Sequence, residues 1–180
     1  MKIPLFCLLP VFIFFGCSQK PDNKRQLSTF SLERDIYRFS EKMNNGDTLY
    51  LTASIGACFD YTIEYNTIFK KNDSVFIQSR LENLPSPNTK KTLPKKLYVY
   101  HQGDSLNFEN LFYSLRKDVT KAKKNEHNTF QVIFNGDTIE FVCKNLMVHL
   151  RKTDYYKRIN ARIYPSETTF KPFEKVVYKP

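Results

Sequence analysis

A short signature of Asn, Gly and Asp recurs before an alternating segment, and this recurrence limits the folds open to the chain. It occurs as NGDTLYL from Asn45, NDSVFI from Asn72, GDSLNF from Gly103 and NGDTIEF from Asn135. Asn and Gly tolerate positive backbone φ, and Asp, Ser and Thr side chains hydrogen-bond nearby backbone, so each signature predicts a tight turn before a β-strand. The spacings are uneven and no other residues match, which indicates recurrent turn chemistry and not a sequence repeat.

Two of the signatures predict β-hairpins. Residues 129–145, TFQVIFNGDTIEFVCKN, place Asn135-Gly136 between two alternating strands, the arrangement that favours a two-residue turn. Asn72-Asp73 in the same way joins a strand at 58–69 to a second at 74–82. An alternating apolar series ahead of these hairpins predicts a further strand, with Leu49, Leu51, Ala53 and Ile55 on one face.

The segment 58–69 has the clearest alternation in the chain. Its apolar positions are Phe59, Tyr61, Ile63 and Tyr65, and its polar positions are Asp60, Thr62, Glu64 and Asn66. The pattern predicts a half-buried strand with the aromatic side inside and with Asp60 and Glu64 on the solvated face. At about 3.3 Å per residue, the α-carbons of these two carboxylates lie about 13 Å apart, too far for a shared metal or a retaining glycosidase pair.

Two segments have helical periodicity. Residues 31–43 place an apolar side chain on one face every three or four residues, and Ser31 is a suitable N-cap. A second helix is expected from Phe108 toward Lys124, with a stripe of Phe108, Leu111, Phe112, Leu115 and Val119. Both helices are expected to pack on the sheet.

The remaining segments complete the predicted fold. KLYVYH from Lys96 and LMVHLRK from Leu146 are interpreted as strands, and the proline-rich stretch 83–95 as a loop. Runs of strands with two separate helices predict an α+β domain, an antiparallel sheet of hairpins with both helices on one face. A β-sandwich with peripheral helices is the alternative. No internal boundary divides residues 30–180, which are expected to form a single domain.

The amino-terminal segment has the character of an export signal. After Met1-Lys2, residues 3–15 are apolar apart from two prolines, and thirteen residues are fewer than the roughly 20 that a membrane-spanning helix needs. Phe14-Phe15-Gly16-Cys17 resembles a bacterial lipobox. The resemblance implies a signal peptide at 1–16, acylation of Cys17, and a flexible tether at 17–29. An ordinary signal peptide with an incidental cysteine is the alternative.

The lipobox resemblance also bears on location and partners. Ser18 lacks the Asp of an inner-membrane retention signal, which favours a lipid-anchored protein of the outer membrane, periplasmic or surface-facing. The formal charge is +10, but an exported chain rarely meets nucleic acid. Anionic lipid headgroups or an acidic envelope protein are the expected counterparts, unless the basic residues only form a solvated face.

The lipobox resemblance accounts for two of the four cysteines. It implies that Cys7 is removed with the signal peptide and that Cys17 carries the lipid, which leaves Cys58 and Cys143 in an oxidising compartment. A disulfide between them and two separate buried thiols are both open at this point.

The sequence has no recognised catalytic motif, and His101, His127 and His149 do not have metal-ligand spacing. No catalytic residue, metal or cofactor is therefore expected. A candidate interaction surface comes from tyrosines and nearby cations, which are favoured at interfaces: Tyr98, Tyr100, Tyr155, Tyr156, Lys157 and Arg158. The strand propensity of tyrosine is the alternative explanation.

Three functions follow in order of preference. The first is a non-enzymatic binding or structural lipoprotein of the cell envelope. The second is a tethered immunity or inhibitor protein against a toxin. The third is a hydrolase with an unrecognised site.

Overall fold

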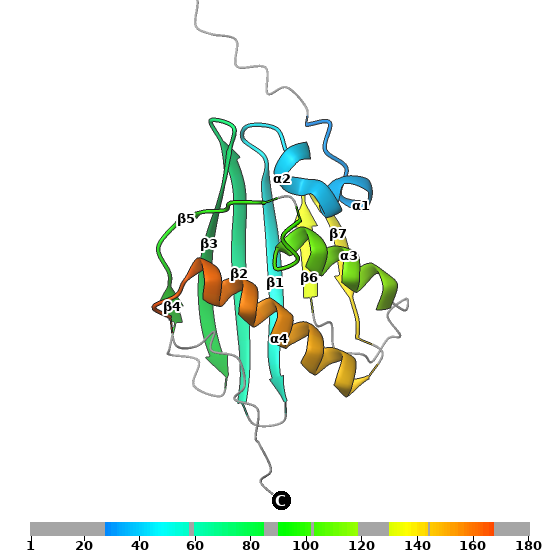
Figure 1. Ribbon diagram of the computed structural model, residues 1–180, viewed down its shortest axis with the longest axis vertical. Helices are drawn as coiled ribbons and strands as arrows, with labels where there is room; N and C mark the ends of the chain where they lie inside the picture. The colour runs from blue at the N-terminus through cyan, green and yellow to red at the C-terminus, as the bar shows by residue number, and fades with distance from the viewer. Residues whose placement is uncertain are drawn as a thin grey trace, which may run out of the picture.

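The computed structural model describes residues 28–57, 60–84, 90–101, 103–118, 130–143 and 145–167. It is an α+β fold in which helices cover one face of an antiparallel, unclosed seven-stranded sheet, as predicted (Figure 1). The path β4-β3-β2-β1-β6-β7 gives the strand order, and β5 also pairs with β3. The strands are β1 Thr48–Ala57, β2 Asp60–Lys71, β3 Ser74–Leu84, β4 Lys90–Thr92, β5 Lys96–Leu97, β6 Phe130–Phe134 and β7 Asp137–Phe141.

Both predicted hairpin turns are confirmed. Asn72 and Asp73 have φ values of 50° and 58°, and they join β2 to β3 in a long antiparallel ladder. Asn135 and Gly136, at 49° and 93°, join β6 to β7. Two successive positive φ angles give a turn whose twist matches that of the flanking strands, which is why Asn, Asp and Gly occupy these positions.

The two predicted helices are also present. Residues 31–43 form a helical segment of three short pieces, α1 Leu32–Asp35, η1 Ile36–Arg38 and α2 Phe39–Lys42. The expected stripe of Leu32, Ile36, Phe39 and Met43 is buried. Ser31 makes no side-chain cap, and its backbone N–H instead donates to Asp35 Oδ2 at 2.9 Å. The second helix, α3 Phe108–Asp118, buries Phe108, Leu111, Phe112 and Leu115.

The prediction of a strand at 146–152 is wrong, because these residues begin the 18-residue helix α4 Leu146–Ile163. Asn145 caps the helix by accepting a hydrogen bond from the Val148 N–H at 3.0 Å. The buried stripe of α4 is largely polar, with Thr153, Tyr156 and Asn160 beside Val148 and Ile159. Because the buried stripe is largely polar, the segment lacks the apolar periodicity that indicates a helix. Leu146, Val148 and Leu150 instead alternate with other residues as the apolar residues of a strand do.

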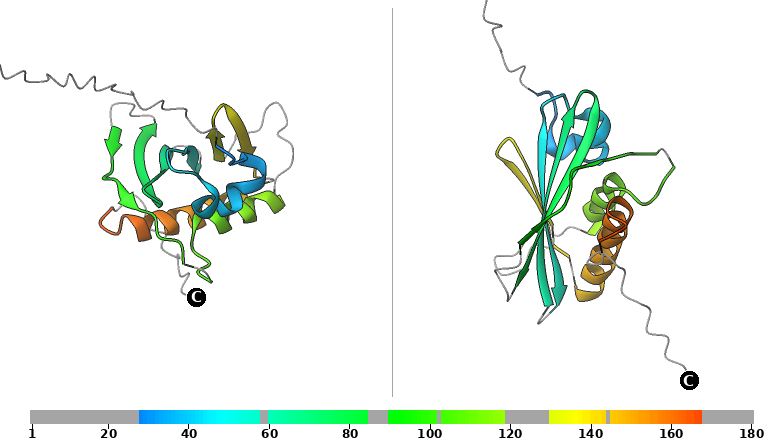
Figure 2. Two further views of the ribbon diagram at one scale, coloured as in Figure 1. Left: turned by 90° about the horizontal axis from the view of Figure 1, so that it is seen from above. Right: turned by 90° about the vertical axis from the view of Figure 1, so that its left-hand side faces the viewer.

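The strand predicted at 96–101 is confirmed only in part. Regular pairing ends at Leu97, and the chain then crosses to the helix side of the sheet ahead of α3 (Figures 1 and 2). Tyr98 enters the core there, with its ring stacked on Phe39 at a centroid distance of 5.4 Å. The loop predicted at 83–95 includes the short strand β4, which pairs with β3.

The core lies between the sheet and the helices and is rich in aromatic residues. Tyr156 of α4 contacts Phe108 of α3 and Phe130 of β6, with ring centroids 6.0 and 5.6 Å apart. Phe112 stacks on Phe141 of β7 at 6.2 Å. These contacts join α3 and α4 to β6 and β7, and buried residues from Phe30 to Ile159 belong to one hydrophobic core.

The prediction for the two faces of β2 is wrong. Glu64 is 1% exposed and lies on the helix side with Asn66, whereas Ile63 and Tyr65 lie on the opposite side. The register explains this placement, because Glu64 pairs with Ala53 and Asn66 with Leu51, two buried residues of β1. Neighbouring residues in a ladder share a face, so the buried side of β1 fixes the buried side of β2.

Candidate interaction surface

One side of the sheet has no helix over it within the described part of the chain. Figure 2 shows α1 to α4 on one side of the strands and only strands on the other. We call that second side the open face. Its apolar and cationic side chains are Tyr50, Ile63, Tyr65, Phe69, Phe76, Arg80, Lys95, Leu97 and Ile133.

The aromatic side chains of the open face are arranged in rows across the strands. Phe69 of β2 pairs with Phe76 of β3, and their rings stack with centroids 5.6 Å apart. Phe76 also pairs with Leu97 of β5, which is 53% exposed. Farther along, Tyr50 of β1 pairs with Ile133 of β6 and is 52% exposed. The result is apolar surface spread over five strands.

Cations cover part of this apolar surface. The Lys95 ammonium lies 4.9 Å from the centroid of the Phe76 ring, and the Arg80 guanidinium lies 4.5 Å from that of Tyr65. Such cation–π contacts favour conformations in which the long basic side chains lie over the aromatic rings and do not extend into solvent. Among the described residues, neither Lys95 nor Arg80 has a carboxylate partner.

The two described carboxylates on the open face, Glu82 and Glu140, already have partners. Glu82 lies 3.5 Å from Lys90, and Glu140 accepts a hydrogen bond from Gln131 at 3.1 Å. The open face therefore combines exposed apolar groups with an excess of positive charge. The exposed side of an antiparallel sheet is usually polar, and apolar patches with a polar rim commonly mark binding surfaces.

The helix side of β2 is, by contrast, a buried polar network. The Asn66 amide donates to the Tyr156 hydroxyl at 2.6 Å and accepts from Ser79 Oγ at 2.6 Å. The Tyr164 hydroxyl donates to the Ile77 carbonyl at 3.3 Å. These bonds connect β2 and β3 to α4 and to the residue after it, and they explain the polar stripe of that helix.

Glu64 is the ionisable member of this network. Burial raises its pKa to about 7, against the hydrogen bond from the Tyr156 hydroxyl and the nearby positive charge of Lys157. Its Oε2 and the Asn160 Oδ1 are buried without a hydrogen-bond partner among the described residues. A neutral carboxyl suits this environment better than a carboxylate does, since burial penalises the charged form.

The helix side also has a buried acid–phenol pair and two hollows. The Tyr98 hydroxyl donates to Glu109 Oε2 and accepts from the Phe108 N–H at 3.0 Å. Burial raises the pKa of both Tyr98 and Glu109. Glu109 borders a surface hollow of about 640 Å³, and a smaller cavity of about 190 Å³ lies between residues 96–107 and α4.

The structure disperses the tyrosines predicted to form an interaction surface. Tyr98 and Tyr156 are 7% and 0% exposed and belong to the core. Tyr155 is half-buried with its hydroxyl on the Ser105 carbonyl, whereas Tyr100 is exposed beside the larger hollow.

The two predicted cations lie on α4. Arg158 is exposed and pairs with Asp154 at 2.9 Å. Lys157 is half-buried, and burial lowers its pKa. The six predicted residues therefore do not form one exposed patch.

Sequence reasoning overlooked the open face because its apolar residues alternate like those of a buried strand. The available signal was indirect: α4 has Thr153, Tyr156 and Asn160 at helical spacing, and a polar stripe of this kind needs a polar surface opposite. Glu64 and Asn66 supply that surface, which leaves Ile63 and Tyr65 outside.

Several predicted sites lie outside the described residues. They include Cys17 with the signal peptide and most of the tether, and also Cys58 and His127. Cys143 follows β7 and is half-buried, and because Cys58 lies outside the described residues, the disulfide and the two separate thiols both stay open. The described residues hold no group of three His, Cys, Asp or Glu side chains suited to a metal. None of their helices has the length and apolar character needed to cross a membrane.

Comparison with known proteins finds no matching family, no matching curated protein and no matching solved structure. A function for this chain therefore has to be inferred from its own residues.

Proposed function

We propose that the protein is a non-enzymatic binding lipoprotein of the bacterial outer membrane, and that its open face holds an acidic protein of the envelope. The observation that carries the proposal is the orientation of β2, which directs Ile63, Tyr65 and Phe69 away from the helices. Burial of these apolar groups by a partner would favour binding by about 25 cal/mol for each Å² of apolar surface that is removed from water.

The charge of the open face selects the kind of partner. Lys95 and Arg80 lie over aromatic rings and have no carboxylate partner in the described part of the chain, and the full sequence carries a formal charge of +10. Like charges disfavour a second copy of the chain at this surface, whereas carboxylates of an acidic partner would pair with both cations. The aromatic rings would then supply contact area at the centre of the interface.

The anchor is proposed from the resemblance of Phe14-Phe15-Gly16-Cys17 to a lipobox. Acyl chains on Cys17 would each contribute about 0.8 kcal/mol per buried methylene, which is sufficient for stable attachment when two or more chains are present. Cys17→Ala should therefore move the protein from the membrane fraction to the soluble fraction. Retention of this variant in the membrane fraction would contradict the anchor.

Site-specific photocrosslinking in intact cells tests the surface. A photoreactive phenylalanine analogue replaces Tyr50 on the open face in one full-length variant, and Tyr113 on α3 in a matched control. The two tyrosines are 52% and 51% exposed, so accessibility is equal and only the face differs. We expect an acidic envelope protein to crosslink at position 50 and not at position 113.

A crosslinked protein supports the proposal only if crosslinking depends on the positive charges of Arg80 and Lys95. Arg80→Glu combined with Lys95→Glu should abolish the crosslink at position 50, because the variant would repel an acidic partner. Equal capture at both positions, capture of lipid alone, or capture of a second copy of the chain would overturn the proposal. A toxin captured in the charge-dependent way would assign the tethered immunity role to the same surface.

A further inference from the structure

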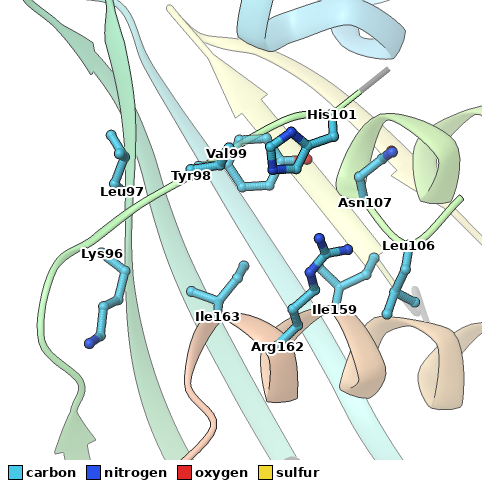
Figure 3. Close-up of a pocket in the computed structure, with 10 residues that line it drawn as sticks. All are labelled: Lys96, Leu97, Tyr98, Val99, His101, Leu106, Asn107, Ile159, Arg162 and Ile163. Carbon is cyan, nitrogen blue, oxygen red and sulfur yellow. The ribbon is translucent and has the colours of Figure 1, made fainter. Parts of the chain in front are cut away.

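The cavity of about 190 Å³ on the helix side has a chemistry that neither the fold nor the proposed function uses. It lies between the crossing segment 96–101, the turn before α3 and the last two turns of α4 (Figure 3). Its apolar walls come from Val99, Leu106, Ile159 and Ile163. Leu97 of β5 borders both this cavity and the open face, but the two have no other described residue in common, so an inference that rests on Arg162, His101 and α4 is independent of the proposed function.

The polar groups at the cavity favour an anion. Of the described residues that line it, none is acidic, and Arg162, His101 and Lys96 are basic. Figure 3 shows the Arg162 guanidinium rising from α4 toward the His101 ring on the crossing segment, while the Lys96 ammonium points away from both. Arg162 and His101 therefore define one end of the cavity.

The Arg162 guanidinium is oriented by its neighbours. One of its N–H groups donates to Asp104 Oδ2, and the Asp104 carboxylate in turn accepts the Leu106 N–H at 2.9 Å. Asp104 has a pKa below its usual range because of these bonds, so it stays charged and keeps Arg162 in place. A guanidinium has five N–H donors, and the Asp104 bond leaves others to bind a second anion.

The uncharged polar side chains at the cavity, Tyr98 and Asn107, already make hydrogen bonds within the fold, and those of Tyr98 are to Glu109 and to the Phe108 N–H. The Asn107 amide donates to the Asp104 carbonyl at 2.6 Å and accepts the Asn110 N–H at 2.8 Å at the start of α3. Recognition of a polar ligand would therefore come from the basic end, and the rest of the cavity offers only apolar contact.

The volume limits the size of the ligand. At about 30 Å³ per water-sized group, 190 Å³ holds about six non-hydrogen atoms. Drug-sized pockets are larger, about 300 to 1,000 Å³. The part of a ligand that the cavity encloses is therefore a short aliphatic group of about five carbons, and the charged group lies at the basic end, where the His101 and Arg162 side chains are exposed.

We propose that this cavity binds an aliphatic carboxylate with a tail of about five carbons, its carboxylate on Arg162 and His101 and its tail between Val99, Ile159 and Ile163. A planar carboxylate matches the fork of a guanidinium. The same chemistry occurs in a free short-chain acid and in a polypeptide that ends in an apolar residue. Which of these two sources is used is decided by the experiment.

The test measures binding to the full-length protein in lipid nanodiscs, by saturation-transfer NMR and calorimetry, with empty nanodiscs as the blank. 4-Methylpentanoate is the probe, and its neutral amide is the charge control. We expect the carboxylate to bind and the amide to bind at least about tenfold more weakly, since one charge-assisted contact is lost. The tripeptide Gly-Gly-Leu, as free acid and as C-terminal amide, tests the polypeptide source.

Two variants and one matched control locate the binding. Arg162→Gln should weaken carboxylate binding about tenfold, and Val99→Trp should block the tail while leaving Arg162 intact. Arg158→Gln, one turn earlier on α4 and also ion-paired, removes a charge that does not line the cavity. Equal binding of acid and amide, or equal loss in the Arg162 and Arg158 variants, would overturn the proposal.

Preference among the carboxylates assigns the source. Tighter binding of 4-methylpentanoate than of Gly-Gly-Leu indicates a free acid as the ligand, and the reverse order indicates a polypeptide carboxyl terminus. Absence of binding by both acids would refute the site.

Discussion

On the helix side of the sheet, β2 presents Glu64 and Asn66, and on the open side it presents Ile63, Tyr65 and Phe69. The polar side is compensated inside the molecule, because Asn66 bonds to Tyr156 of α4 and to Ser79 of β3. The apolar side has only cations over its rings in the described residues. Buried polar groups are tolerated when they are hydrogen-bonded. Exposed apolar groups contribute no hydrophobic stabilisation until another surface covers them. The helix side therefore accounts for stability, and the open side is the part left for recognition.

Substitution of one tyrosine on each side should give the largest contrast. Tyr156→Ala removes a fully buried ring and the acceptor of the 2.6 Å hydrogen bond from the Asn66 amide, and we expect a loss of about 3–5 kcal/mol in the free energy of unfolding. Tyr65→Ala removes a half-buried ring from the open face and should cost about 1 kcal/mol or less. Urea denaturation followed by circular dichroism measures both. Similar losses for the two variants would show that the open face is part of the folding core.

The next contrast is between the buried Glu64 and the exposed Glu140, in how each affects the pH dependence of the free energy of unfolding. The folded-state pKa of Glu64, about 7, lies above its ordinary value of 4.5, so the folded state holds this proton more tightly than the unfolded state does. Stability from this group is therefore greatest below pH 4.5, falls as the pH rises from 4.5 to 7, and is constant above that. A folded-state pKa of about 7 against an ordinary value of 4.5 corresponds to about 3 to 4 kcal/mol of stability that depends on pH.

Glu64→Gln should remove this part of the pH dependence, as measured by urea denaturation at several pH values. Lys157 and Glu167 also act on Glu64 through their charges, so the comparison is made against the wild type at each pH. Glu140→Gln is the matched control, because Glu140 is exposed on the edge strand β7. Unchanged pH dependence in the Glu64 variant, or an equal change in both, would contradict the assignment.

The two sides of β2 also separate what the sequence could predict from what it could not. Turns such as Asn72-Asp73 and Asn135-Gly136 depend on local backbone conformation, and the helical stripe of α3 depends on contacts within one turn, so both were predictable. Alternation in β2 shows that the strand has two different faces, but it does not show which face the helices cover. That choice depends on Tyr156, which lies 90 residues from Asn66 along the chain.

The same reasoning explains the error at α4. Its buried stripe contains Thr153 and Asn160, which match the polar side of β2 but resemble solvent-exposed residues when the segment is considered alone. When two polar surfaces bury each other, neither has the apolar periodicity from which burial is predicted, so both are predicted to be exposed. The candidate surface was missed for this reason, since Ile63 and Tyr65 were predicted to face the core.

The smallest expected effect concerns the cations on the open face. Arg80 lies over Tyr65 at 4.5 Å, and an exposed cation–π contact contributes about 0.5–1 kcal/mol. A double-mutant cycle with Arg80→Gln and Tyr65→Leu, measured by urea denaturation, should give a coupling free energy of that size. Arg158→Gln with Tyr65→Leu is the control and should give none, because Arg158 is on α4, on the other side of the sheet. A coupling near zero for Arg80 and Tyr65 would mean that Arg80 is not held against the ring, and that any partner must order this side chain when it binds.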